Sequence, residues 1–365
     1  IELTIEIAEE KNIKVDVKGY EEALEAQRER ARSAISSDDG MAKQNPLFKE
    51  ITVDSKFVGY DKLEVNTKVV LLTDLVSIKD SVASGETYII LDECPFYAES
   101  VGQVSDKGFV NDMEVLAVQK IANGQFLIKL NLISELKVGD EVVAKVDKNH
   151  RDLVTSNHSA THLLHLALHD LVGTHAKQAG SLQDEFKTRF DFTNLAPMEE
   201  DKIVEIENFV NNLINNNDEV IIKEMKIDEA KAMGANALFG EKYGDIVRVV
   251  KMGNSIELCG GTHVSTTNEI KHFHILSEVG IGSGIRRIEA ITGELVIDYG
   301  NKLINKIKDE LNNLNTNIDS KNKVSLNIIE ELKTKLVKLM NVYNNNFDVI
   351  LDDIMKVEEK AKELE

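Results

Sequence analysis

The stretch Asn157-His-Ser-Ala-Thr-His-Leu-Leu-His165 places two histidines four residues apart. Residues at this spacing lie on one face of a helix, so both imidazoles can point at one ion. A second stretch, Glu257-Leu-Cys-Gly-Gly-Thr-His-Val264, offers a cysteine and a histidine at the same spacing. Together the two pairs form a set of three imidazoles and one thiolate that suits a single zinc ion in tetrahedral geometry: His158, His162, Cys259 and His263.

Both pairs lie in a region, 150–295, where helical and strand patterns alternate as in an α+β domain. A helix is expected from about Arg151 to about Val172, with Gly173 as its stop. The first histidine pair would therefore sit on this helix. The other expected elements of the region are a strand at 186–192, a helix at 199–216 and a buried strand at 245–251.

The preceding regions have different patterns. Good helix formers dominate residues 1–45, which predicts helices there. From 46 to 149 the chain changes to short β-type runs separated by Gly and Asp turns, which favours a small antiparallel β-barrel. The runs that carry this prediction are 67–73, 87–92, 113–118, 126–130 and 138–146.

The tail, 296–365, has apolar residues that step by three and four along two segments, with a break near 320–323. We expect an antiparallel helical hairpin within the chain, and self-association through these helices is the functional alternative. Asn344-Asn-Asn346 is a candidate interruption of the second arm.

The composition limits the kinds of partner. Hydrophobic residues make up 42% of the chain, and it has no run of about 18 apolar residues that would cross a membrane. The net charge of -20 argues against unspecific coating of nucleic acid but allows a local basic groove. Two cysteines, Cys94 and Cys259, predict no disulfide framework and fit a cytoplasmic location. No signal peptide is visible and the chain opens on Ile1, so we expect a piece of a longer protein.

Other interpretations compete with zinc binding. His165 and His169 share the helical stripe of the predicted ligands, and we expect them to be ordinary core or surface histidines. A zincin protease is not expected, because Ser159 stands where His-Glu-x-x-His needs its general base. Cys259 could instead be a small buried hydrophobe or a nucleophile paired with histidine. Four protein ligands normally close a zinc site, so catalysis would need a fifth ligand, a departing ligand or water in place of one.

Seven stretches resemble, in order and in spacing, the editing domain of alanyl-tRNA synthetase: 157–165, 173–181, 189–192, 237–244, 247–250, 257–263 and 284–290. Phe96-Tyr-Ala-Glu-Ser100 and Gly102-Gln103 resemble the barrel motif that precedes this domain, although Val101 stands where the family usually has Gly. The first residues resemble the end of the tRNA-recognition helices. The tail is similar only in kind to the helical linker that leads to the family's C-terminal domain.

The resemblance implies hydrolysis of mischarged Ser-tRNA(Ala) and Gly-tRNA(Ala) at one zinc ion, with the acceptor end of tRNA(Ala) as partner. A second, hydrolytic site is physically sensible, because one methylene is worth only about 1–3 kcal/mol in a pocket. The resemblance also implies that Thr161 and Gln178 border the catalytic pocket, where Thr161 or zinc could recognise the serine hydroxyl. The ATP-binding domain that attaches alanine to tRNA(Ala) would lie outside this chain.

The sequence allows more than one mechanism and more than one role for the two arginines. Zinc could activate a water or anchor the substrate, and Glu257 is the one carboxylate close to a ligand in sequence. Gly280-Ile-Gly-Ser-Gly284, followed by Arg286 and Arg287, could hold the backbone near the CCA end with both arginines on phosphates. The alternative is a tight turn followed by salt bridges of strand or surface residues.

The predicted fold class is therefore α+β: a small antiparallel β-barrel and a zinc-dependent α+β editing domain, between an N-terminal helical segment and a C-terminal helical hairpin. Alternatives for the function are a free-standing trans-editing deacylase and a zinc-stabilised tRNA-binding module without activity of its own. The related editing domain of threonyl-tRNA synthetase shares the metal pattern but not the wording at 237–244.

Overall fold

The computed structural model describes residues 16–19, 45–121, 123–236, 244–320, 322, 324–343 and 348–363. Most of the helical segment predicted for 1–45 lies outside these residues, as do nearly all of the stretch 237–244 and the Asn344-Asn-Asn346 interruption. The chain divides into two compact units. The first holds the described residues up to Val58 with Val65–Cys94 and Val110–Ala144, and the second holds Gly59–Glu64, Pro95–Phe109 and the described chain from Lys145 onward.

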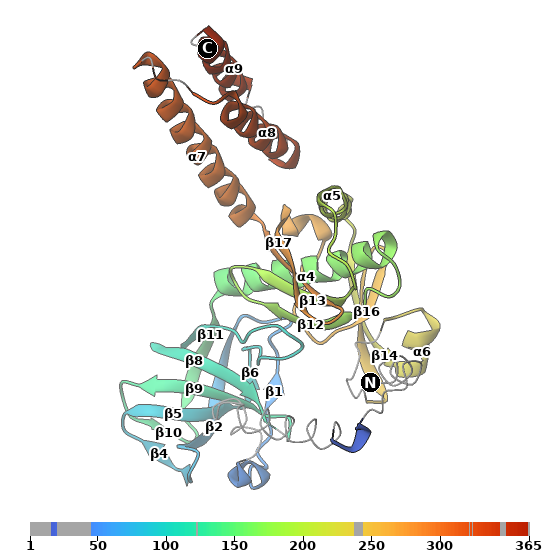
Figure 1. The fold of residues 1–365 in the computed structure, drawn as a ribbon. Coiled ribbons are helices and arrows are strands. Elements are labelled where there is room, and N and C mark those ends of the chain that lie inside the picture. The colour runs from blue at the N-terminus through green and yellow to red at the C-terminus, as the bar shows by residue number, and fades with distance from the viewer. Residues whose placement is uncertain are drawn as a thin grey trace. The chain divides into compact units, whose positions relative to one another are not determined.

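The predicted barrel is confirmed. Six strands follow one another in the order β11-β7-β8-β9-β5-β2, and β2 pairs with β11 to close the ring (Figure 1). Burial alternates along β11 and along the first six residues of β2, so every second side chain there fills the interior, as the period of two in the sequence requires. The strands of the ring are β2 (Glu64–Thr73), β5 (Gly85–Leu91), β7 (Gly108–Val110), β8 (Met113–Lys120), β9 (Phe126–Leu132) and β11 (Glu141–Val146).

Short elements complete this part of the fold. A 3-10 turn, η1 (Pro46–Lys49), begins at Asn45, whose side chain accepts a hydrogen bond from the Leu47 N–H. Phe48 of this turn packs with buried residues of the barrel strands, including Ile90 and Leu127. The short strands are β1 (Lys56–Phe57) paired with β6 (Glu93–Cys94), β3 (Ile78–Lys79) paired with β2, and β4 (Ser81–Val82) paired with β10 (Leu136–Lys137).

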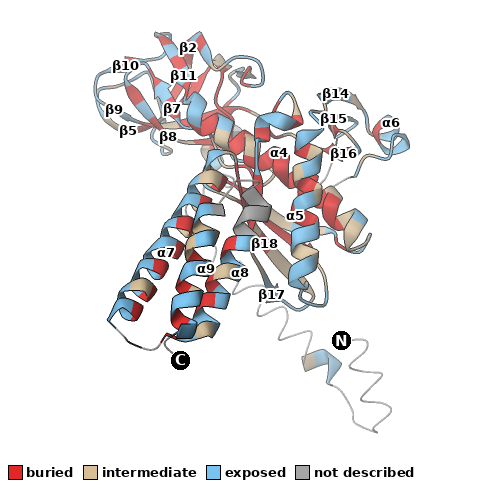
Figure 2. Ribbon diagram, turned by 90° about the horizontal axis from the view of Figure 1, so that it is seen from above, coloured by how far each residue is buried: buried red, intermediate tan, exposed pale blue. Residues whose placement is uncertain are grey.

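The second unit is built around one buried helix, α4 (Lys148–Leu171), which packs against a four-stranded antiparallel sheet (Figure 1). Asp147 caps its first turn by accepting from the N–H groups of Asn149 and His150, and Gly173 follows its end at a φ of 133°. Figure 2 shows that most of α4 is buried. The strands of the sheet, in spatial order, are β12 (Gln178–Gln183), β13 (Thr188–Thr193), β18 (Ile285–Thr292) and β17 (Phe273–Gly282).

A second, three-stranded sheet carries the cysteine pair. Its central strand, β15 (Ile246–Met252), pairs with β14 (Val220–Lys226) and β16 (Ser255–Leu258), and Cys259 follows β16 directly. The helices predicted at 151–172 and 199–216 and the strands predicted at 186–192 and 245–251 are all present within a few residues. The remaining elements of this region are α5 (Glu200–Asn215), α6 (Ile227–Ala232) and the 3-10 turn η2 (Thr267–Ile270).

Within its described residues the tail contains three helices where a two-armed hairpin was predicted: α7 (Glu294–Asp319), α8 (Leu326–Tyr343) and α9 (Asp348–Glu363). Two ion pairs show the directions of these helices: Lys335–Glu310 indicates that α8 runs antiparallel to α7, and Lys360–Asp319 indicates that α9 turns back and runs parallel to α7. The apolar residues at the predicted spacing whose side chains the structure describes pack into one shared core. The break near 320–323 is confirmed, but the second arm is two antiparallel helices, because apolar spacing alone does not show where a chain reverses. None of the described helices has the length and apolar character needed to cross a bilayer. The four-domain division stays a prediction.

Candidate metal centre

The two predicted ligand pairs come together in the second unit. The Nε2 or Nδ1 and Sγ atoms that the four side chains offer all lie within 4.8 Å of one another, and these residues can hold a metal ion. We call them the His/Cys cluster: His158 and His162 of α4 with Cys259 and His263 of the loop after β16. The Nε2 of His158 lies 3.4 Å from the Sγ of Cys259. Ligands of a tetrahedral zinc ion would be about 3.5 Å apart, given metal–ligand bonds of about 2.0–2.3 Å.

Hydrogen bonds to the far ring nitrogen determine the tautomer of His158. The Oε1 of Gln103 accepts from the Thr262 N–H at 2.9 Å, which identifies this atom as the amide oxygen. The same oxygen lies 2.8 Å from the Nδ1 of His158, so Nδ1 must carry the proton and donate it. The Nε2 of His158 therefore presents a lone pair to the cluster.

The other two imidazoles are held in the same way. A carboxylate can only accept, so the Nδ1 of His162 carries its proton toward Glu257, and in the neutral ring that a metal ion requires the Nε2 is the lone pair. The Ser159 hydroxyl donates to the Thr155 carbonyl and lies 3.4 Å from the Nδ1 of His263, from which it can only accept. All three rings thus turn Nε2 toward the centre of the cluster.

Two of these nitrogens provide a direct test of whether a metal fits. The Nε2 atoms of His162 and His263 are buried, and neither has a hydrogen-bond partner among the described residues. Buried polar atoms are normally paired, because leaving one unpaired costs about 1–3 kcal/mol. A metal ion among the four donors would satisfy both orphan nitrogens, so the donor set fits a bound ion such as zinc.

The electrostatics of the cluster favour a cation. Burial raises the pKa of a thiol, yet the imidazoles of His158, His263 and His162 hold the pKa of Cys259 well below its usual value. Burial likewise opposes ionisation of Glu257, but His162 beside it lowers the pKa of this carboxyl group to about 2. These directions favour a thiolate and a buried carboxylate; burial opposes a charge on His162, but Glu257 and Cys259 raise the pKa of this imidazole to about 10, and a divalent cation would take over the role of its proton.

The backbone of the cysteine loop has no space for side chains at one position. A Cβ atom on Gly261 would lie 2.1 Å from the Cε1 of His158, whereas a Cβ on Gly260 would meet nothing within 4 Å. Arg248 donates to the carbonyls of Cys259 (2.8 Å) and Gly261 (2.9 Å). The Tyr60 hydroxyl donates to the carbonyl of Gly260 at 2.6 Å, and the Arg248 guanidinium lies 4.2 Å from its ring centroid. These two side chains tie the loop to the 59–64 segment and to β15.

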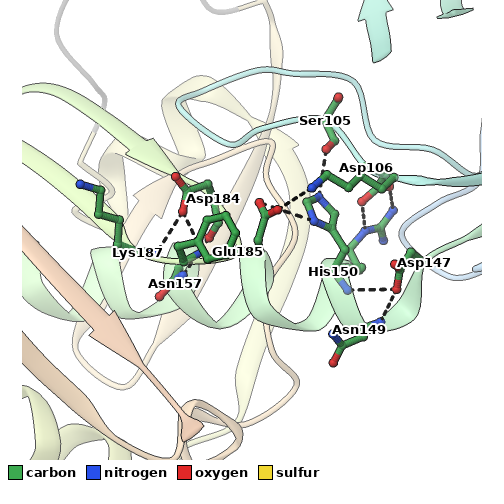
Figure 3. A network of polar contacts seen from close by, with 12 residues as sticks. Ser105, Asp106, Asp147, Asn149, His150, Asn157, Asp184, Glu185 and Lys187 are labelled. Atoms are coloured by element: carbon green, nitrogen blue, oxygen red, sulfur yellow. Dashed lines mark hydrogen bonds and ion pairs between the residues drawn. The ribbon is translucent and has the colours of Figure 1, made fainter. Parts of the chain in front are cut away.

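Polar contacts also fix the first turns of α4 (Figure 3). His150 contacts the Ser105 carbonyl at 3.2 Å, and Asn157 donates to the Asp184 carbonyl at 2.8 Å. Arg151 and Asp106 form a buried ion pair in which Nε lies 2.7 Å from Oδ1. The helix is therefore locked to the 95–109 segment and to the β12–β13 connection before its ligand residues begin.

Thr161 and Gln178, the two residues predicted to border the pocket, are both in the second unit. The Thr161 hydroxyl donates to the Asn157 carbonyl at 2.8 Å and lies 2.6 Å from the Thr188 hydroxyl. Gln178 is half-buried at the start of β12 and donates to the Ser181 hydroxyl at 3.2 Å. Among the described residues, no hydrogen bond joins either side chain to the His/Cys cluster, and their roles stay predictions.

The two predicted phosphate-binding arginines are already paired. Arg286 forms a bidentate pair with Glu278: its Nε donates to Oε1, and its NH2 donates to Oε2 at 2.6 Å. The Glu278 side chain is 2% exposed. Arg287 forms a bidentate pair with Asp191 at 2.7 and 2.9 Å. These are the strand salt bridges that the alternative interpretation expected, and binding of tRNA by either arginine stays a prediction.

Val101, which stands where the resembling barrel motif usually has glycine, has an unusual backbone conformation. Val101 has a φ of 47°, in the left-handed region, and Gly102 follows at 81°. A β-branched residue rarely adopts this conformation, whereas glycine does so freely. The loop therefore keeps the turn that a glycine would favour, and the valine bears the strain.

Sequence reasoning missed several residues that shape the site. In the sequence Gln103 stands only in the stretch that resembles the family's barrel motif, and no pattern assigns a role to Tyr60 or Arg248. The sequence marks Glu257 only as the carboxylate close to a predicted ligand, whereas in the structure its two carboxylate oxygens contact the Nδ1 atoms of His162 and His165. The expectation that His165 is an ordinary buried histidine overlooked this shared carboxylate. The one available signal was Gly102, because a glycine lets the backbone adopt a left-handed turn and approach a neighbouring segment closely.

Two family models match the chain. The model described as tRNA synthetases class II (A) matches residues 1–150, and the one described as threonyl and alanyl tRNA synthetase second additional domain matches 247–289. The second match contains Cys259 and His263, while the histidine pair of α4 lies between the two matches.

Similar curated proteins are named alanine–tRNA ligases. The one from Halalkalibacterium halodurans is 46% identical over 317 residues, which are 85% of this chain and 36% of the relative. Those from Bacillus subtilis (44% over 356 residues, 94% of this chain and 40% of the relative) and Lactococcus lactis (46% over 322 residues, 86% and 36%) are similarly close. The chain spans little more than a third of the length of these relatives.

Proposed function

Because the chain belongs to the alanyl-tRNA synthetase family, as its motifs predicted, we propose that its His/Cys cluster binds one zinc ion and forms the site of an aminoacyl-tRNA deacylase. The proposed substrates are Ser-tRNA(Ala) and Gly-tRNA(Ala), held by the acceptor end of the tRNA. One observation carries the proposal: three Nε2 lone pairs and a thiol converge, and each ring is fixed through its Nδ1.

The proposed reaction is hydrolysis of an ester. Water adds to the ester carbonyl, the bond to the ribose oxygen breaks, and the amino acid leaves while the tRNA regains its hydroxyl. A bound zinc ion would supply Lewis acidity at this point. The chain's own residues hold the ligands in place: Gln103, Glu257 and Ser159 keep the three rings from rotating. Glu257 has both oxygens committed to imidazoles, so it orients a ligand and is not available as a general base.

Thr161 can recognise a serine hydroxyl only as a hydrogen-bond acceptor. Its single hydroxyl proton goes to the Asn157 carbonyl and one lone pair faces Thr188, which leaves one lone pair to accept. A serine hydroxyl would therefore have to donate to it. Replacing Thr161 with Val should slow release of serine more than release of glycine, because glycine has no hydroxyl to lose. Equal slowing of both substrates would remove Thr161 from serine recognition.

A second candidate function is a tRNA-binding module with structural zinc. Four protein donors close a zinc site, and closed sites are usually structural. Under this alternative, loss of metal unfolds the second unit and the chain has no hydrolytic activity.

The decisive experiment follows release of serine from Ser-tRNA(Ala), with Ala-tRNA(Ala) as control, before chelation, after chelation and after zinc restoration. We expect zinc-dependent release of serine that spares alanine. His158→Ala and Cys259→Ala should abolish it, while Cys94→Ala, at the other cysteine of the chain, should not. A folded, zinc-loaded chain without hydrolysis, together with melting on chelation, would replace the deacylase by the binding module.

Properties of the whole enzyme are part of the same proposal. The parent protein would attach alanine to tRNA(Ala) with an ATP-binding domain that this chain does not contain, and it would act in the cytoplasm. Self-association through α7, α8 and α9 stays a prediction. Analytical ultracentrifugation of the chain, with and without the residues from Glu294 onward, would measure it.

A further inference from the structure

Gln103 is the residue outside the His/Cys cluster with the most direct hold on it. Its side chain is fully buried and comes from the 95–109 segment, which precedes α4 in the chain. Its amide makes three hydrogen bonds. Oε1 accepts from the Nδ1 of His158 (2.8 Å) and from the N–H of Thr262 (2.9 Å), and Nε2 donates to the Thr262 hydroxyl (2.9 Å).

These bonds connect both halves of the cluster. One partner, His158, is a ligand of the α4 pair, and the other, Thr262, stands directly before the ligand His263. The Thr262 hydroxyl also lies 2.7 Å from that of Thr155, one turn before the α4 ligands. A single amide group therefore sets both the ring orientation of one ligand and the backbone that delivers another.

The backbone of Gln103 is itself fixed. Its N–H and C=O both pair with Ser100, at 2.9 and 3.1 Å, which closes a tight turn. On the other side, Gln183 of β12 donates to the carbonyl of Gly102 at 2.8 Å. A Cβ on Gly102 would lie 2.3 Å from the Ser181 hydroxyl oxygen, so the turn can approach β12 only because this residue is glycine. The amide thus projects from a rigid support.

We propose that Gln103 is a positioning residue of the metal centre, which locks His158 in the Nδ1–H tautomer and holds the Cys-Gly-Gly-Thr-His loop in the ligating arrangement. The inference rests on the metal binding proposed above. Partners in this position normally change metal affinity by 10–100-fold when they are removed, because an unheld imidazole rotates away from its ligating orientation.

The test uses the full chain and three variants. Gln103→Met keeps the length of the side chain but removes its hydrogen bonds, and Gln103→Glu keeps the acceptor for His158 and Thr262. Gln125→Met is the matched control, because Gln125 is also a buried glutamine but bonds to the Val53 carbonyl in the first unit. Zinc affinity is measured by competition with a chelator, and the Co²⁺ absorption spectrum reports ligand geometry.

We expect Gln103→Met to lose about 10–100-fold in zinc affinity and to alter the Co²⁺ bands, while Gln103→Glu restores most of both and Gln125→Met changes neither. Unchanged affinity and spectrum in a folded Gln103→Met chain would overturn the inference. If that variant does not fold, NMR of the zinc-loaded unmodified chain decides: a protected His158 Nδ1–H signal supports the inference, and an unprotonated Nδ1 overturns it. An unmodified chain that binds no zinc would instead refute the proposed function.

Discussion

Substitution of Gly261 by Ala should destroy the metal centre, whereas the same substitution at Gly260 should leave it intact. Neither glycine has a left-handed φ, so the difference between them is one of space. An added Cβ at Gly261 lies 2.1 Å from Cε1 and 2.3 Å from Nδ1 of His158, and 2.9 Å from the Oε1 of Gln103. Ordinary van der Waals contact begins at 3.4 Å, and at Gly260 nothing lies within 4 Å.

The required displacement sets the magnitude. The His158 ring or the cysteine loop must move by more than about 1 Å, while metal–ligand distances tolerate only about 0.2 Å. One ligand is therefore lost. Because removal of a partner that only orients a ligand already costs 10–100-fold, loss of the ligand itself should lower zinc affinity at least about 100-fold.

The assay is a chelator competition on the purified chain, with bound zinc counted by atomic absorption and folding checked by circular dichroism. Gly260→Ala should match the unmodified chain in stoichiometry and affinity. If Gly261→Ala binds zinc as tightly as Gly260→Ala, the close approach of this loop to His158 is wrong, and with it the geometry on which the metal centre is built.

Three further predictions each compare variants at a separate feature of the structure. His165→Ala should weaken zinc binding about tenfold, because one oxygen of Glu257, the carboxylate that also orients His162, loses its hydrogen-bond partner. His169→Ala, at a side chain 40% exposed, should have no effect, and chelator competition compares the two variants. Val101→Gly should be more stable than Val101→Ala by about 1 kcal/mol in thermal unfolding, the reverse of the usual order, since only glycine relieves the positive φ. Arg151→Met should lower the free energy of unfolding by about 3–5 kcal/mol in urea titration, because it leaves Asp106 as an unpaired buried charge; a loss below about 1 kcal/mol would mean that the pair is solvated.

The elements of the fold were predictable where the pattern was local. β11 and the first part of β2 alternate with a period of two, and α4 has a strong N-cap at Asp147 and a glycine after its end, so neighbouring residues suffice to define these elements. The tail shows the limit of such patterns. Where the structure describes the side chains of α8 and α9, apolar spacing indicated the buried positions correctly, but it did not reveal that α9 reverses direction, because the same stripe forms whether the chain continues or turns back.

The sequence by itself determined the candidate donor set: two pairs of metal-binding residue types at a spacing of four, with glycines where the loop must pass close to His158. Only the tertiary structure decided the surroundings of these donors. The tertiary structure pairs Arg286 and Arg287 with carboxylates and places His165 in contact with Glu257. It also brings Gln103 to the ring of His158, 55 residues away in the chain. Helical periodicity fixes the face on which a side chain lies, but the partner it meets there depends on how distant segments pack, which no local pattern encodes.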